Sequence, residues 1–128
     1  MIFGIGTDIV RIARMAKALE RFGERFAQRI LTAEEMLEFR ASARPAFFLA
    51  KRFAAKEAAA KAMGLGFQQG LSLRHIAVAH DQLGKPLLRF EGYAAEFIAT
   101  HGIDEVHLSL ADEEDHAVAF VTLGRRSG

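Results

Sequence analysis

One uninterrupted helical stretch constrains this chain more than any other feature. Residues 45–66 read PAFFLAKRFAAKEAAAKAMGLG, and neither Gly, Pro nor Asn occurs from 47 to 63. Alanine, which dominates the stretch, has the lowest helix cost of any residue. Pro45 suits the first turn, where a missing N–H costs nothing, and Gly64 suits the left-handed position just past a helix end. The sequence therefore predicts a long central helix.

Charged side chains interrupt this alanine-rich helix at regular intervals. Arg52 and Lys56 are four residues apart, and so are Glu57 and Lys61. Residues at this spacing are neighbours on a helix surface, so Glu57 and Lys61 can form an ion pair. Exposed pairs of this kind are common and contribute only about a few tenths of a kcal/mol. Taken alone, the pattern indicates a solvated helix face.

Length and composition narrow the class of protein. A chain of 128 residues predicts one domain, which we place at 1–124, followed by a flexible tail at 125–128. The chain has no cysteine, which excludes disulfides and thiolate metal sites and fits a reducing compartment such as the cytoplasm. No apolar run approaches the ~18–20 residues that cross a bilayer, so we expect no membrane partner. The net charge of +1 disfavours a globally basic nucleic-acid binder.

The first strand ends near an isolated acid. Residues 2–10 are rich in β-favouring side chains, and Asp8 is the one acid among them. A buried ionised carboxylate is costly unless it is paired or bound to a metal. Asp8 either caps the helix that follows, because Asp is a good N-cap residue, or belongs to a site. The strand alone leaves both interpretations open.

Residues 11–26 predict an amphipathic helix with a possible interruption at Gly23. Basic side chains advance along it by three and four residues and form a ridge on one side: Arg14, Lys17, Arg21 and Arg25. The ridge is either an ordinary solvated face or a docking surface for an acidic partner. Nucleic acid is a weaker candidate, because neither Trp nor Tyr accompanies these charges.

The remaining patterns predict an α+β fold with an antiparallel sheet packed against the long central helix. Thr32 and Glu35 fit a capping box that opens a short helix. The Gly-rich residues 64–72 predict a loop. The other expected elements are a hairpin of strands 76–80 and 86–91 with Gly84 in its turn, a helix at 92–101, and strands at 106–111 and 117–123.

Two carboxylates stand out once the elements are placed. If the first strand packs beside the central helix, Asp8 and Glu57 can converge, and Lys61 lies one turn beyond Glu57. One or two carboxylates completed by water and substrate phosphates are the usual ligands of Mg²⁺. Phosphoryl transfer requires positive charge near the phosphate oxygens, and a divalent cation together with an ammonium group supplies it.

Four blocks of the sequence resemble the holo-[acyl-carrier-protein] synthases, a family of 4′-phosphopantetheinyl transferases. They are GIGTDIVRIAR at 4–14, FLAKRFAAKEAAAKAMGLG at 48–66, LGKP at 83–86 and HLSLADEEDHAVAFV at 107–121. The resemblance extends from residue 1 to about 123, with the blocks in the family's order. It implies the family's α+β fold and transfer of 4′-phosphopantetheine from coenzyme A to a serine of apo-acyl carrier protein, which leaves adenosine 3′,5′-bisphosphate.

The resemblance also implies roles for individual residues. Asp8 and Glu57 match the family's Mg²⁺ ligands, and Lys61 matches a lysine near the pyrophosphate of coenzyme A. His107 and the turn that contains Pro86 match parts of the coenzyme A pocket, and Arg52 and Lys56 are further candidates for its phosphates. The mechanism we expect uses Glu57, through a water on the metal, as general base.

The family resemblance also gives the basic ridge a partner, because carrier proteins of this class are acidic and helical. The family is usually a homotrimer with active sites shared between subunits, so the face of His107 and Ser109 is expected at that interface. Many relatives carry a serine where this chain has Ala111, and no function is expected of that position.

Two other functions remain as alternatives. One is a non-catalytic module of the same fold that binds coenzyme A or an acidic protein; intact Asp8, Glu57 and Lys61 argue against it. The other is a small nucleic-acid-binding domain, which the near-neutral charge disfavours. The remaining histidines lack metal-ligand spacing and receive no role: His75, His80, His101 and His116.

Overall fold

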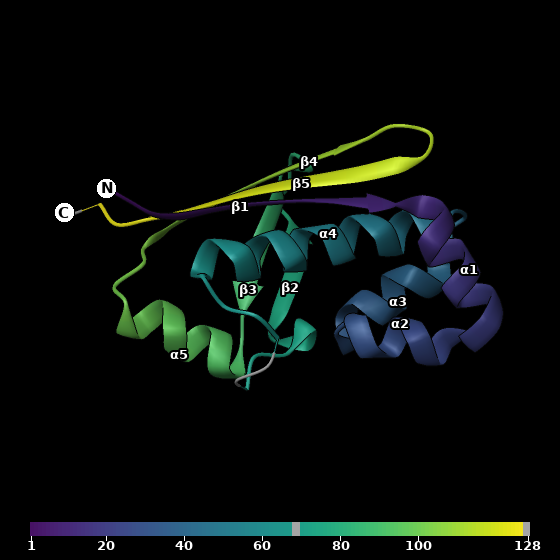
Figure 1. Ribbon diagram of the computed structural model, residues 1–128, viewed down its shortest axis with the longest axis horizontal. Helices are drawn as coiled ribbons and strands as arrows, with labels where there is room; N and C mark the ends of the chain where they lie inside the picture. The colour runs from purple at the N-terminus through teal and green to yellow at the C-terminus, as the bar shows by residue number, and fades with distance from the viewer. Residues whose placement is uncertain (68–69, 127–128) are drawn as a thin grey trace.

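A computed structural model describes residues 1–67 and 70–126 (Figure 1). The strands are β1 (Ile2–Arg11), β2 (Ile76–His80), β3 (Pro86–Phe90), β4 (Glu105–Asp112) and β5 (His116–Gly124). The helices are α1 (Ile12–Phe22), α2 (Glu24–Ile30), α3 (Ala33–Ala41), α4 (Pro45–Met63), the 3-10 turn η1 (Leu73–His75) and α5 (Gly92–Thr100). These elements confirm the predicted α+β class.

The sheet is antiparallel and lies along the central helix, as predicted. Its strand order is β1-β5-β4, and in Figure 1 it covers the whole length of one side of α4. The register sets Asp8 opposite Ala119 of β5, and Ala119 opposite Leu110 of β4. Directly opposed residues share a sheet face. The face that packs on α4, called here the inner face, therefore carries Gly4, Gly6, Asp8 and Val10 of β1.

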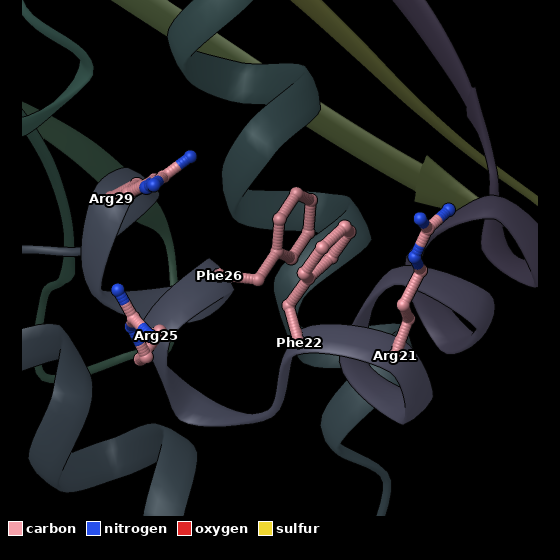
Figure 2. A pocket seen from close by; sticks show the side chains of 5 residues that line it. All are labelled: Arg21, Phe22, Arg25, Phe26 and Arg29. Atoms are coloured by element: carbon pink, nitrogen blue, oxygen red, sulfur yellow. The ribbon is translucent and has the colours of Figure 1, made fainter.

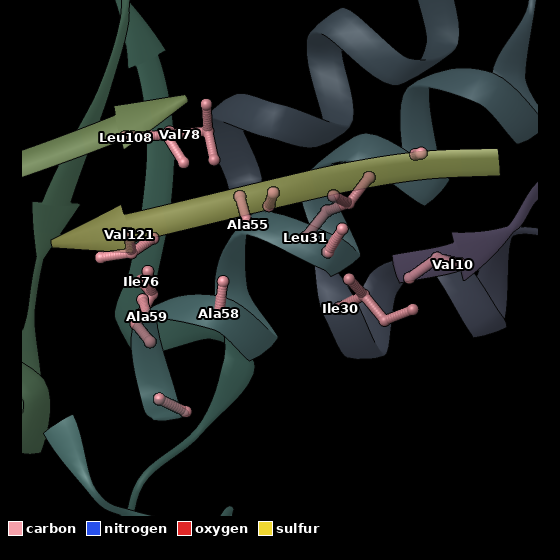
Figure 3. Packing of buried hydrophobic residues seen from close by; sticks show 14 of the residues in the cluster. Val10, Ile30, Leu31, Ala55, Ala58, Ala59, Ile76, Val78, Leu108 and Val121 are labelled. Carbon is pink, nitrogen blue, oxygen red and sulfur yellow. The ribbon is translucent and has the colours of Figure 1, made fainter. Parts of the chain in front are cut away.

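Helix α4 has the ends that its sequence predicts. Pro45 occupies the first turn, and Gly64 has left-handed backbone angles, φ 79° and ψ 21°. The helix is buried on nearly all sides, because the sheet covers one face while β2, η1, α1 and α3 cover others. Its alanines are small enough to let these neighbours approach closely (Figure 3).

The predicted helix at 11–26 is two helices. Gly23 separates α1 from α2 with φ 66° and ψ −153°, a backbone conformation that favours glycine. Helix α2 then continues to Ile30, which is buried. Arg25 consequently stands on a different helix from Arg14, Lys17 and Arg21. The capping box of Thr32 and Glu35 at the start of α3 is present as predicted.

Strands β2 and β3 form the expected hairpin with Gly84 in its turn, at φ 85°. One carboxylate oxygen of Asp81 accepts hydrogen bonds from the N–H groups of Leu83 and Lys85, which closes the turn. The loop predicted at 64–72 is irregular where described, and residues 68–69 lie outside the described part of the chain.

The start of β1 and the end of β5 lie together at one end of the sheet (Figure 1). The N–H of Arg125 donates to the carbonyl of Met1 over 2.8 Å, and the Nε of Arg125 donates to the carbonyl of His101 over 2.6 Å. Of the tail expected at 125–128, residues 127–128 lie outside the described residues. Across the part of the chain that the structure describes, no helix combines the length and hydropathy needed to cross a membrane.

Candidate active site

Asp8 reaches α4 because of the strand alternation of β1. Side chains along a strand point alternately to opposite faces, and Asp8 follows Gly4 and Gly6 on the inner face. A glycine at these two positions leaves no side chain between strand and helix. The Asp8 side chain is therefore brought against α4 and keeps only 17% of its surface exposed.

Lys61 of α4 pairs with Asp8. The ammonium nitrogen of Lys61 lies 3.0 Å from Oδ1 of Asp8 and donates to the carbonyl oxygen of Thr7 over 3.1 Å. Among the described carboxylates, Asp8 is the ion-pair partner of Lys61, although the helical spacing favoured Glu57. The Lys61 side chain remains 54% exposed, so the ammonium is also accessible from solvent.

Glu57 completes this group one turn earlier on α4. Burial raises the pKa of Glu57, and the negative charge of Asp8 raises it further, while Lys61 and Arg14 act in the opposite direction. The influence of Asp8 shows that the two carboxylates are near neighbours. Strand β1 and helix α4 thus bring together three residues that the resemblance connects: Asp8, Glu57 and Lys61.

The donors at this site fit a magnesium ion. Within the described residues no cluster of three or more His, Cys, Asp or Glu side chains forms, so the protein offers two carboxylates here. Mg²⁺ is usually held by one or two carboxylates plus substrate phosphates and water, unlike a structural metal enclosed by the protein. The like-charge repulsion that raises the pKa of Glu57 is what a divalent cation between the two carboxylates would relieve.

A cavity of about 270 Å³ lies beside the N-terminal half of α4. Arg52 on the helix and Pro86 at the start of β3 both line it, so the structure brings these two predicted residues together. Lys51, His80 and Asp112 line it as well, and Lys51 forms an ion pair of 2.9 Å with Asp112. Of the described residues, Asp8, Glu57 and Lys61 lie outside this lining.

The structure contradicts the expectation for Lys56. Its side chain is fully buried, and its ammonium donates to Oε1 of Glu35 over 2.7 Å and to the carbonyls of Leu73 and Ile76 over 3.1 and 2.5 Å. An ammonium has three donors, so none remains for a phosphate. Burial lowers the pKa of Lys56, against the opposing charge of Glu35. Lys56 is therefore a core residue and not a phosphate contact.

Arg52 is also largely buried, with 6% of its side chain exposed. Its guanidinium donates to the carbonyl of Val78 over 2.6 Å and to Glu38 over 2.7 Å, and it lies over the ring of Phe48. No pattern in the sequence indicated that Glu35, Lys56 and Arg52 share one buried cluster. The one available signal was the capping box, which marked Glu35 as a residue that folds back on its own helix.

His107 lies on the other face of the sheet. It stands opposite Thr122, which stands opposite Ile5, and these residues share the face that points away from α4, called here the outer face. The His107 side chain is 63% exposed. The structure therefore separates His107 from Asp8 and Glu57 of the same chain by the thickness of the sheet.

The basic ridge is exposed along α1 and α2, with all four of its predicted residues on the surface. Arg21 and Arg25 border a cleft of about 490 Å³ that Phe22, Phe26 and Arg29 also line. In Figure 2 the two Phe rings point into the same space, with Arg21 on one side and Arg25 and Arg29 on the other. Phe22 is 54% exposed, an apolar surface within a cationic rim that the sequence did not predict.

Comparison with known proteins identifies the family of this chain. A sequence profile described as 4′-phosphopantetheinyl transferase superfamily matches residues 4–121. The holo-[acyl-carrier-protein] synthase of Halorhodospira halophila is 58% identical over 123 residues, which cover 96% of this chain and 98% of that protein. The crystal structure of the same synthase from Neisseria meningitidis has a TM-score of 0.92 and 48% identity, over 98% of this chain and 100% of that chain.

A solved structure with a ligand is also similar. The Bacillus anthracis holo-(acyl-carrier-protein) synthase, determined in complex with CoA (3′,5′-ADP), has a TM-score of 0.81 and 37% identity over 98% of both chains. The profile and the similar synthases define an enzyme of the phosphopantetheinyl transferase class, and the chain belongs to the 4′-phosphopantetheinyl transferase superfamily. Along nearly its whole length it is similar to the holo-[acyl-carrier-protein] synthases, which confirms the resemblance read from its four sequence blocks.

Proposed function

We propose that this enzyme transfers the 4′-phosphopantetheine group of coenzyme A to a serine of an apo-acyl carrier protein in the cytoplasm. The observation that carries the proposal is the convergence of Asp8, Glu57 and Lys61 where β1 meets α4. The similarity to synthases of this name over the full chain supports the same reaction. The direct test is the mass of an apo-carrier protein before and after incubation with this enzyme and coenzyme A.

The reaction breaks the phosphoanhydride bond of the coenzyme A pyrophosphate and forms a phosphodiester bond to the carrier serine. The serine hydroxyl oxygen of the carrier attacks the phosphorus atom attached to pantetheine, and the bond from that phosphorus to the bridging oxygen of the pyrophosphate breaks. The products are the phosphopantetheinyl serine and adenosine 3′,5′-bisphosphate, which leaves with the bridging oxygen. A base must accept the serine proton. Because the carrier protein supplies the nucleophile, this chain needs no serine, histidine or cysteine nucleophile of its own.

Two residues supply charge and proton transfer in this proposal. Lys61, whose ammonium is accessible, offsets negative charge on the phosphate that leaves. Glu57 accepts the serine proton through a water molecule. Asp8 orients Lys61 through their 3.0 Å ion pair.

Asp8 and Glu57 would together hold Mg²⁺. When bound, the ion supplies positive charge for the pyrophosphate oxygens of coenzyme A and for the leaving phosphate. The rest of coenzyme A is proposed to follow α4 toward the cavity of Arg52 and Pro86. Arg52 contributes positive charge there, within a fixed set of hydrogen bonds.

The carrier protein is proposed to dock on the basic ridge of Arg14, Lys17, Arg21 and Arg25. An acidic helical partner complements this charge, and complementary charge mainly accelerates and orients association. The cleft lined by Phe22 and Phe26 offers an apolar contact next to these basic side chains. The charge of Arg14 lowers the pKa of Glu57, which supports a ridge with one end beside the proposed site.

The outer face of the sheet is proposed to join three copies of the chain. Three large apolar side chains are exposed on it: Ile5 at 53%, Ile9 at 63% and Phe120 at 47%. Exposed apolar patches of this kind commonly mark protein interfaces. His107 shares this face, so assembly would bring it toward the coenzyme A of a neighbouring subunit, which it cannot reach within its own chain.

A further inference from the structure

Three charged side chains form a closed cluster in the interior, between α3, α4 and β2. Glu35 is 2% exposed, Arg52 5% and Lys56 0%. Burying a charge is costly unless it is paired and hydrogen-bonded, so the contacts of such a cluster are under strong constraint. The chemistry proposed above uses neither Glu35 nor Lys56.

The Glu35 carboxylate is the centre of this cluster. Its Oε1 accepts from the ammonium of Lys56 over 2.7 Å and from the N–H of Thr32 over 2.9 Å. Its Oε2 accepts from the N–H of Val78 over 3.0 Å and lies 3.5 Å from a guanidinium nitrogen of Arg52. One carboxylate thus connects the start of α3, two successive turns of α4 and the middle of β2.

The cluster takes the place of a missing strand beside β2. In the part of the chain that the structure describes, β2 pairs with β3 alone, so its other edge has no strand neighbour. On that edge Glu35 accepts from the N–H of Val78, Arg52 donates to the carbonyl of Val78 over 2.6 Å, and Lys56 donates to the carbonyl of Ile76 over 2.5 Å. Charged side chains from two helices therefore satisfy backbone groups that a third strand would otherwise pair.

The hairpin held in this way forms one wall of the cavity of about 270 Å³. His80, Gly84 and Pro86 belong to the hairpin or its turn, whereas Phe48, Lys51 and Arg52 face them from α4. The distance between the two walls depends on how β2 is fixed to α4. The Glu35 cluster makes that connection through direct hydrogen bonds.

We propose that Glu35 is a positioning residue for coenzyme A: it sets the width of this cavity by anchoring the β2–β3 hairpin to α4. The proposal rests on the proposed function, in which coenzyme A occupies the cavity. Glu35 itself is too buried to touch the ligand, and it acts through Lys56, Arg52 and Val78. Supporting groups of this kind matter because a displacement of about 1 Å can reduce activity by up to about 100-fold.

The test compares coenzyme A binding in two variants of the full chain by titration calorimetry. Glu35→Gln removes the charge and leaves Lys56 without its counter-ion. Glu35→Gln with Lys56→Met removes both charges, which buried pairs often tolerate with little loss of stability. In both variants we expect the Kd for coenzyme A to rise about tenfold, as expected for displaced supporting groups. The KM for the carrier protein should stay within about twofold, since the basic ridge is on other elements.

Ile103→Val serves as the matched control for lost stability. Ile103 is buried and precedes β4, whereas Leu110 and Asp112, which line the cavity, lie at the far end of that strand. This variant should lower the melting temperature and leave the Kd for coenzyme A unchanged. A double variant that folds and binds coenzyme A as tightly as the wild type would overturn the role of Glu35, with the proposed function intact. A wild-type protein that fails to bind coenzyme A would instead overturn the proposed function, and this inference with it.

Discussion

Gly6 of β1 packs directly on the carbonyl group of Ala58 in α4. A Cβ atom placed on Gly6 would lie 1.9 Å from the oxygen of Ala58, and one placed on Gly4 would lie 1.9 Å from the oxygen of Ala62. The strand and the helix therefore touch backbone to backbone. Asp8 comes next on the same strand face, so this contact determines how near its carboxylate lies to Glu57 and Lys61.

Gly6→Ala should be destabilising and should disturb the site. The new methyl group meets backbone atoms, which cannot rotate away, so β1 must move off α4. We expect a loss of about 2 kcal/mol or more in the free energy of unfolding, as for other overpacked sites. Denaturant unfolding measures it. Gly66→Ala is the matched control, because a Cβ there meets no atom of the described residues within 4 Å and its φ is not in the left-handed region. Equal losses in both variants would contradict the packing argument.

Magnesium should stabilise the folded protein through Asp8 and Glu57. A ligand that binds only the folded state adds about 2.7 kcal/mol at a concentration 100 times its Kd. Thermal unfolding with increasing Mg²⁺ should therefore show a rising melting temperature in the wild type and little or no rise in Asp8→Asn. Glu96→Gln, at an exposed position on α5, should respond as the wild type does. A rise of equal size in Asp8→Asn would place the ion elsewhere.

Glu57→Gln should stabilise the metal-free protein at neutral pH. Burial and Asp8 raise the pKa of Glu57 in the folded state above its ordinary value of 4.5, so the folded state binds this proton more tightly than the unfolded state does. Stability is then lost as the pH rises from the ordinary to the raised pKa. The variant avoids that loss, which should be less than about 1 kcal/mol because the carboxylate is partly solvated.

The difference between Glu57→Gln and wild type should disappear when the pH falls below the ordinary pKa, where the wild-type side chain is neutral in both states. Melting curves recorded across this range in EDTA measure the difference. A variant that is less stable than wild type at neutral pH would show that the charge of Glu57 is favourably paired, contrary to this account.

Reversing charge on the basic ridge should weaken binding of the carrier protein and leave binding of coenzyme A unchanged. Lys17→Glu with Arg21→Glu should raise the KM for the carrier about tenfold and reduce its salt dependence, because fewer favourable charges remain to steer association. The KM for coenzyme A should not change. Arg126→Glu, an exposed charge at the other end of the chain, should leave both constants near wild type. A shift confined to coenzyme A would refute docking on the ridge.

Phe120→Asp should dissociate the proposed trimer. Phe120 lies in the middle strand of the sheet and is 47% exposed on the outer face. A charge in the centre of an apolar interface is strongly unfavourable, whereas on an exposed surface it costs little stability. Sedimentation should show a trimer for the wild type and a monomer for the variant. A wild-type protein that sediments as a monomer would contradict the assembly, and with it the role of His107 across subunits.

Local patterns were sufficient to predict most of the fold. The central helix, the capping box at Thr32 and the hairpin turn at Gly84 each depend on neighbouring residues, and the structure confirms them. The break at Gly23 was foreseen only as a possibility. A glycine is tolerated inside a helix at modest cost, so the pattern cannot decide whether it bends, ends or merely weakens one.

The site was harder to predict because it depends on long-range contacts. Nothing local to Asp8 distinguishes a helix cap from a partner of Lys61, which lies 53 residues away in the sequence. Lys56 was misinterpreted for a related reason. A lysine four residues from an arginine on a helix normally faces solvent, but here the hairpin covers both side chains and Glu35 neutralises part of their charge.

The most direct test of the account is the intact mass of apo-acyl carrier protein incubated with coenzyme A, Mg²⁺ and this protein. We predict a gain equal to one phosphopantetheine group, lost with EDTA and strongly reduced in folded Asp8→Ala and Glu57→Ala variants. A gain that survives both substitutions would contradict the assignment of Asp8 and Glu57. No gain with several carrier proteins, from a folded enzyme that binds coenzyme A, would contradict the proposed reaction itself.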